Sequence, residues 1–453
     1  MIVARSTPVR RSRTPIMRIL GEWVFVCFLF AGYYKADPRL GFIQTHIDIT
    51  LLFLILSILA FFLHGVRESF RIKMSLGFTK VAALFLLLVA CLLGGLLYSQ
   101  SREYGLDKAL RFIFFTGWAF FGSAFLISDF LSLRRFSWAL VTISTVMAID
   151  ALLSYSGFGQ VSFVTAFGSN YIALARATGL GLLATVMFLL PTERRLSVRL
   201  LLWMAAALQL WAALSAGARG PILAIILSFL LFFALSVRGL LRLRIDRFAI
   251  RLGIMAIFVG IFLATIGHEI FTTLFFRSQI LVTEVGDSAA ERLFLFEAAL
   301  DQWARSPIWG GGTGQFAVAV MGEDIRLYPH NIILELGAEN GFLGVVIFLV
   351  MIGLALRQGL ISLSNGDQPH RALSRYLLVA FCFALMNAMV SGDINDNRIL
   401  FTLLALLAAP SRFRDYEIES GSIGKRGSEQ MSLRRKQSLQ KIKGASPLIC
   451  SWL

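Results

Sequence analysis

Charged side chains are scarce in this sequence of 453 residues: Asp, Glu, Lys and Arg together make up 15% of it, whereas hydrophobic residues make up 57%. A soluble domain carries about 25% charged residues, so this composition excludes an ordinary soluble globular protein. The mean hydropathy is +0.74. Leucine-rich runs of about 20 residues recur along the chain, and each is long enough to cross a hydrocarbon core of roughly 30 Å as a helix. The sequence therefore predicts a membrane protein.

Cysteine is also rare, with four residues in the whole chain. Cys27, Cys91 and Cys382 fall in apolar runs, and Cys450 lies in a basic C-terminal segment. This pattern indicates neither a disulfide framework nor a metal site. We expect no metal and no cofactor.

Nucleotide-binding signatures are absent as well. The glycine run Gly310-Gly-Gly-Thr-Gly314 follows no predicted strand and precedes no Lys-Ser/Thr pair. A phosphate-binding loop needs both, so we reject a nucleotide-binding fold.

The apolar runs predict an all-α polytopic membrane protein with about 12 transmembrane helices, because helices satisfy their own backbone hydrogen bonds in lipid. The spans are expected at 19–34, 47–65, 79–98, 109–131, 137–156, 171–190, 200–216, 220–237, 249–267, 340–357, 376–392 and 395–410. No internal repeat of the kind found in many secondary transporters is visible in this pattern.

The net charge of +16 lies in short loops and tails between these runs. If the N-terminus is cytoplasmic, roughly three quarters of all Lys and Arg fall on the cytoplasmic side, as the positive-inside rule expects. The charge thus indicates orientation in a membrane, and we expect no nucleic-acid partner. This gives a basic cytoplasmic tail at 1–18, a transmembrane domain at 19–410 and a basic cytoplasmic tail at 411–453, whose composition predicts disorder.

One connection is much longer than the others. Residues 268–339 fall on the outer side and include polar and aromatic residues, and long loops commonly carry function. Ser288-Ala-Ala-Glu291 is a capping-box pattern, which predicts a helix that ends before Pro307.

Three side chains on the predicted outer face are candidates for chemistry. Arg219, in Ala218-Arg-Gly-Pro221, interrupts an apolar stretch, and a charge near hydrocarbon is costly unless it faces a cavity or a partner. A polar hairpin tip with a snorkelling side chain explains it equally well. His330 and Arg292 are weaker candidates, because a loop histidine and a solvated helix face explain them too.

Four further charges form a second rank. Arg176 and Asp150 fall within predicted spans and are expected to line an outer cavity or to sit at the membrane interface. Asp393 and Asp396 precede the last span; they are candidates for binding sugar hydroxyls or orienting a base, although solvated loop carboxylates are the simpler interpretation.

Taken together, three motifs resemble the conserved core of the O-antigen ligase and polymerase superfamily. They are Ala218-Arg-Gly-Pro221, the stretch from Arg292 through Ser306-Pro-Ile-Trp-Gly-Gly-Gly-Thr-Gly-Gln-Phe316, and Pro329-His-Asn-Ile-Ile-Leu-Glu-Leu-Gly-Ala-Glu-Asn-Gly-Phe-Leu-Gly344. The order and spacing match, and the resemblance covers about residues 200–400.

This resemblance implies a helical fold akin to the C-type glycosyltransferases, in a bacterial inner membrane, with a periplasmic active site. The donor would be a glycan on undecaprenyl diphosphate, and the acceptor a lipid A-core or another glycan. Arg219 and Arg292 would bind the donor diphosphate with charge-assisted hydrogen bonds, and His330 would take the proton from the acceptor hydroxyl without a metal. Asn331 would orient the imidazole, and Asp393 matches loosely a family tendency to place an acidic or polar residue between the late spans. Together with Arg176, which lies before the region of the resemblance, these two are candidates for substrate binding.

Two alternatives stand beside the ligase hypothesis. A polymerase that extends lipid-linked repeats would use the same three residues. A polysaccharide transporter or flippase would make no bond and should place its charges near the middle of the membrane. The oligomeric state stays open.

Overall fold

The computed structural model describes residues 16–68, 75–155, 164–237, 287–365 and 368–409, and all elements in these ranges are helices or helical turns. The first half contains α1 (Ile16–Tyr34), η1 (Pro38–Leu40), α2 (Gly41–Gln44), α3 (Ile49–Glu68), α4 (Leu76–Gly95), α5 (Glu103–Arg111), η2 (Phe112–Thr116), α6 (Gly117–Leu126) and α7 (Phe130–Leu153). The second half contains α8 (Tyr171–Leu183), η3 (Ala184–Leu189), α9 (Leu190–Thr192), α10 (Leu196–Ser215), α11 (Arg219–Val237), α14 (Asp287–Arg305), α15 (Gln315–Met321), α16 (Ile332–Asn365), α17 (Gln368–Ala388), η4 (Ile394–Asn397) and α18 (Arg398–Ala408). The all-α prediction is confirmed.

Nine helical spans in the described ranges are long and apolar enough to cross a membrane, and the bent pair Pro38–Gln44 and Ile49–Leu63 makes up to ten. These ten coincide with ten of the twelve predicted spans. The predicted span 249–267 lies outside the described residues, as do 1–15 of the N-terminal tail, 268–286 of the outer loop and the tail 411–453. The chain is a multi-pass helical membrane protein.

The last predicted span, 395–410, is shorter than expected. Helix α18 has 11 residues, which corresponds to about 16 Å at the usual rise, or roughly half of a hydrocarbon core. All of its residues except Ile399 are buried, so α18 packs inside the bundle rather than against lipid. The count of twelve spans is therefore not confirmed.

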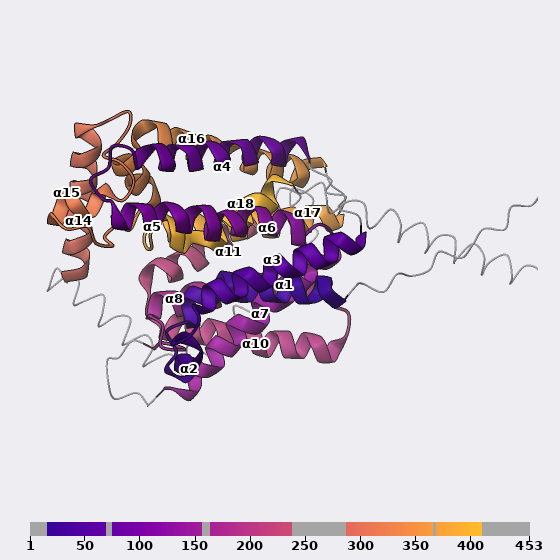
Figure 1. Cartoon of the computed structure of the whole chain (residues 1–453). Coiled ribbons are helices and arrows are strands. Elements are labelled where there is room, and N and C mark those ends of the chain that lie inside the picture. Colours follow the sequence, from indigo (N-terminus) through magenta and orange to yellow (C-terminus); the bar gives the residue numbers. More distant parts are fainter. Residues whose placement is uncertain (1–15, 69–74, 156–163, 238–286, 366–367, 410–453) are drawn as a thin grey trace, which may run out of the picture.

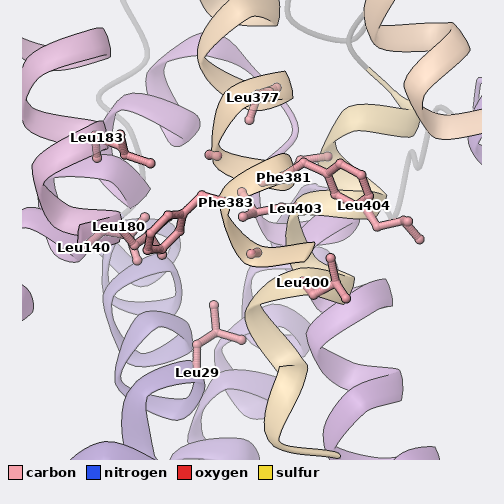
Figure 2. Close-up of a cluster of buried hydrophobic side chains, with 14 of the residues drawn as sticks. Leu29, Leu140, Leu180, Leu183, Leu377, Phe381, Phe383, Leu400, Leu403 and Leu404 are labelled. Carbon is pink, nitrogen blue, oxygen red and sulfur yellow. The ribbon is translucent and has the colours of Figure 1, made fainter. Parts of the chain in front are cut away.

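The core of the bundle lies where α8, α17 and α18 meet α1 and α7. Almost all of the span Tyr171–Thr192 is buried, and Leu180, Phe383 and Leu403 lie among the apolar side chains that Figure 2 shows between these helices. Without a hydrophobic driving force in lipid, such close packing stabilises the association of the helices.

The two ends of the bundle differ in their side chains. At one end lie α14 and α15, which cap the horizontal helices in Figure 1; this is called the α14 end below. At the opposite end, Arg18 pairs with Asp129, and Arg134 pairs with Glu193 at 2.8 Å. Basic residues of several predicted cytoplasmic loops therefore share the end that is remote from α14.

Candidate functional site

The glycine run docks on a break in α16 at the α14 end. Gly341 has φ +63° and ψ −159°, a conformation open essentially to glycine alone. The break frees carbonyl groups, and the glycine run satisfies them: Gly311 N–H donates to Ala338 O and Gly312 N–H to Glu339 O, both at 2.8 Å. The glycine run is thus tied to α16 by its backbone.

A sealed ionic cluster lies directly beside this break. Lys108 of α5 is 1% exposed and lies 2.6 Å from a carboxylate oxygen of Glu335 and 2.7 Å from one of Glu339. The backbone N–H of Ile394 donates to Glu335 at 3.3 Å, and the side chain of Asn395 donates to Lys108 O at 3.1 Å. The cluster, called the Lys108 cluster below, joins α5, α16 and η4. We did not predict it, although two glutamates four residues apart in an apolar run were a signal for it.

The turn η4 forms a second polar layer above this cluster. Asp393 caps η4 through a capping box with Asp396. Arg326, on the loop between α15 and α16, lies 3.0 Å from Asp393 and 2.8 Å from Asp396. Burial and the neighbouring Asp396 raise the pKa of Asp393. In this structure the predicted binding residue Asp393 therefore holds Arg326 and η4 in place.

His330 lies on the same loop, immediately before α16. Its backbone adopts φ +56°, which is uncommon for a residue with a side chain. Asn331 caps α16 by accepting from residues 333 and 334, and its Nδ2 donates to Met389 O at 3.1 Å. These hydrogen bonds of Asn331 thus fix the backbone beside His330, and none of them is made to the imidazole.

The imidazole of His330 is half buried, and its Nδ1 has no hydrogen-bond partner among the described residues. Burial lowers the pKa of His330, and the positive charge of Arg292 lowers it further. The Tyr328 ring meets the imidazole edge to face, with ring centroids 4.6 Å apart. A histidine in this environment is neutral near pH 7, and a neutral imidazole can accept a proton.

The other two predicted site residues lie at the same end. The helix predicted after Ser288 is confirmed as α14, and Arg292 is half buried in its first two turns. Arg219 is exposed at the start of α11. A Cβ on Gly220 would lie 2.9 Å from Val390 Cγ2, so α11 begins directly against the end of α17, where Asn331 also binds. Arg219 and His330 therefore flank the same short segment.

A cavity of about 760 Å³ opens on the other side of Tyr328. Its basic lining residues are Lys35, Arg111, Arg176, Arg326 and Arg398, and its acidic ones are Asp48, Asp107 and Asp396. Leucine and phenylalanine side chains of α1, α3, α5 and η2 complete the wall. None of Arg219, Arg292 and His330 lines this cavity.

Two arginines at the cavity are deeply buried: Arg176 is 8% exposed and Arg398 is 9% exposed. Arg176 donates to Asn397 Oδ1 at 3.0 Å and to Ser391 O at 3.3 Å. Arg398 donates to Phe28 O at 3.2 Å. Arg176 was expected at an outer cavity and lines this one. Arg398 was not predicted; a cation at the start of an apolar run was its only signal.

Asp150, one of the weaker candidates from the sequence, takes part in a structural ion pair. Its carboxylate lies 2.7 Å from Arg39 of η1, and its other oxygen accepts from residue 167 N–H at 2.8 Å. It thus joins the end of α7 to η1 and to the segment before α8.

Part of the chain matches a known protein family. The family model described as O-antigen ligase matches residues 204–349. Over these residues the predicted resemblance to the O-antigen ligase and polymerase superfamily is confirmed. No individual curated protein matches the chain.

The matched region of the O-antigen ligase family contains Arg219, Arg292, His330 and the glycine run, and it ends within α16. It is shorter than the predicted family core of 200–400. The matched region does not include Lys108, Arg176 and Arg398. Part of the buried charge at the α14 end therefore comes from segments that the family model does not cover.

Proposed function

We propose that this protein is a metal-independent glycosyltransferase that moves a glycan from undecaprenyl diphosphate to a lipid A-core or another hydroxyl acceptor. The observation that carries the proposal is His330: a histidine kept neutral by burial and by Arg292, held rigidly before α16, next to the start of α11 with Arg219. The match of residues 204–349 to the O-antigen ligase family supports the same reaction class.

In the proposed reaction, the acceptor oxygen attacks the anomeric carbon of the donor sugar. The bond between that carbon and the diphosphate oxygen breaks, and its electron pair leaves with the diphosphate. Neutral His330 accepts the proton of the acceptor hydroxyl. Arg219 and Arg292 stabilise the charge that develops on the leaving diphosphate, which guanidinium groups match with paired hydrogen bonds.

The proposed setting is the bacterial inner membrane, with the α14 end in the periplasm and both termini in the cytoplasm. Basic residues at the end opposite α14, such as Arg18, Arg134 and Arg135, support this orientation. The same orientation leaves the segments 1–18 and 411–453 as basic cytoplasmic tails.

The test uses purified protein in liposomes, supplied with a short undecaprenyl-diphosphate oligosaccharide with and without lipid A-core. Products are separated on gels and weighed by mass spectrometry. We expect a single transfer that needs lipid A-core, and a loss of at least about 100-fold in His330→Ala, because general bases contribute 10²–10⁴-fold. Arg219→Ala and Arg292→Ala should lose a comparable amount.

The matched control is Arg305→Ala, because Arg305 is an exposed arginine at the other end of the same helix as Arg292. This variant should keep full activity. A ladder of products from donor alone would instead identify a polymerase that uses the same residues. Activity that survives His330→Ala and Arg219→Ala would contradict the proposed site, whereas the absence of any product from the wild type under both conditions would favour a transporter.

A further inference from the structure

The cavity beside Tyr328 holds more positive charge than its own carboxylates compensate. Five basic and three acidic side chains line it. Arg111 pairs with Asp107 at 2.9 Å, and Arg326 pairs with Asp396 at 2.8 Å. These pairs account for two of the three carboxylates.

The two most deeply buried cations of the cavity lining have neutral partners. Within the described residues, no carboxylate oxygen lies within 4.0 Å of the guanidinium nitrogens of Arg176 or Arg398; amide and carbonyl oxygens accept their hydrogen bonds. Arg398 also lies over the Phe28 and Phe115 rings, 5.3 and 5.8 Å from their centroids. Burying a charge without a counterion is costly, and proteins keep such charges mainly at sites that bind ligands.

Both arginines come from different helices and face the same space. Arg176 projects from α8 and Arg398 from the start of α18, and both belong to the cavity lining. Gly392 passes close to Arg176 and Gly32 to Arg398, where an added Cβ would lie 3.4 Å and 3.1 Å from the guanidinium nitrogens. The backbone is therefore built closely around both groups, which leaves them little freedom to turn away from the cavity.

Part of the remaining wall is apolar. Leu51 and Leu54 of α3 and Phe114 of η2 line it, so charged and apolar surfaces meet in one space. This combination fits an amphiphile whose anionic group lies against the arginines.

We propose that this cavity binds the acceptor, and that a phosphate or carboxylate group of the acceptor lies between Arg176 and Arg398. The assignment to the acceptor rests on the proposed function, in which Arg219 and Arg292 hold the donor diphosphate. None of the three catalytic candidates lines the cavity, but Tyr328 lines it and contacts His330. An acceptor bound here lies on the cavity side of Tyr328 and extends its hydroxyl past this ring towards the imidazole, while the donor occupies the imidazole side.

The first experiment measures binding without turnover. Farnesyl diphosphate serves as a short anionic amphiphile, and binding to the full-length protein in detergent is followed by isothermal titration, with farnesol and inorganic pyrophosphate as comparisons. We expect each protein molecule to bind two molecules of farnesyl diphosphate, one in each site. Arg176→Gln and Arg398→Gln should weaken one of them by about 10- to 100-fold, the range for a charged hydrogen bond. Arg219→Gln should weaken the other, and the exposed Arg102→Gln neither.

Arg176→Lys keeps the charge and should retain more binding than Arg176→Gln, which separates a binding role from a structural one. Size-exclusion profiles and melting temperatures establish whether each variant is folded. A single equivalent that is insensitive to both Arg176→Lys and Arg176→Gln would overturn the site. A single equivalent that Arg176→Gln abolishes and Arg219→Gln leaves intact would make the cavity a donor site and overturn the assignment to the acceptor.

The second experiment compares acceptors. Wild-type protein should prefer the native acceptor about 10-fold or more over an acceptor that has lost its anionic group. One modified acceptor lacks its phosphates and the other has its carboxylates reduced, so the comparison of the two identifies which anion the cavity binds. In Arg176→Gln this preference should fall towards unity, with the KM for the donor unchanged. Two binding equivalents without any transfer would refute the proposed function while leaving the anion site intact.

Discussion

The Lys108 cluster and the Arg176–Arg398 cavity both place buried cations at the same end of one bundle. They differ in whether carboxylates neutralise these cations. Lys108 meets two carboxylates within 2.7 Å and is 1% exposed. Arg176 and Arg398 meet neutral oxygen atoms beside an open space of about 760 Å³. A compensated, sealed charge holds helices together, whereas an uncompensated charge at a cavity is positioned to meet a ligand.

The largest effect is expected in the Lys108 cluster. Lys108→Met leaves two carboxylates buried without a cation, which typically costs about 3–5 kcal/mol. We expect a melting temperature far below that of the wild type, or no folded protein, in a thermal unfolding assay in detergent. Adding Glu335→Gln and Glu339→Gln to Lys108→Met should recover much of the loss. If Lys108→Met melts like the wild type, the cluster does not hold the helices together and the contrast fails.

The break in α16 supports the cluster through the backbone. Gly341→Ala places a Cβ 2.3 Å from Ile308 O at a φ of +63°, and such strain costs about 1–3 kcal/mol before the clash is counted. A lowered melting temperature measures this. Gly353→Ala is the matched control in the same helix, because its Cβ meets nothing within 4 Å, and alanine favours a helix by about 1 kcal/mol over glycine. Equal effects of the two changes would show that the break has no structural role.

The pH profile of transfer tests the charge around His330. The pKa of His330 is lowered from its ordinary value, so the base stays neutral until the pH falls through the lowered pKa, and activity is lost only below it. Arg292→Gln removes a positive charge, so the acid limb of the profile should move to higher pH, in addition to a loss of rate. Glu291→Gln removes a negative charge that raises the pKa of His330, so its acid limb should move to lower pH. Shifts of the same sign would exclude His330 as the titrating group.

The smallest effect is expected at the cavity itself. Arg398→Met removes a buried cation that has no carboxylate partner, so the relief of desolvation should offset the lost hydrogen bond to within about 1 kcal/mol. The thermal unfolding assay used for Lys108→Met measures both variants side by side. A loss as large as that of Lys108→Met would mean that Arg398 is a structural cation and that the two regions do not differ.

Much of the architecture follows from the sequence because apolar length and helical period are local properties. Ten of the spans, the helix α14 before Pro307 and the resemblance of residues 204–349 to O-antigen ligases were all predicted from runs, caps and motifs. The exception is α18, where an apolar run of ordinary appearance belongs to a buried helix of 11 residues. Apolar sequence does not distinguish a lipid-facing helix from one surrounded by protein.

The residues of the candidate site also divide into those that the sequence predicted and those that only the structure revealed. Arg219, Arg292 and His330 stand in motifs that are readable along the chain, and the sequence by itself determined these candidates, the membrane class and the helical fold. Only the tertiary structure decided which charges are compensated: it joined Lys108 to Glu335 and Glu339, which lie more than 220 positions away, and brought Arg176 and Arg398 to one cavity. Coulomb interactions depend on distance in space and on burial, and neither is fixed by position along the chain.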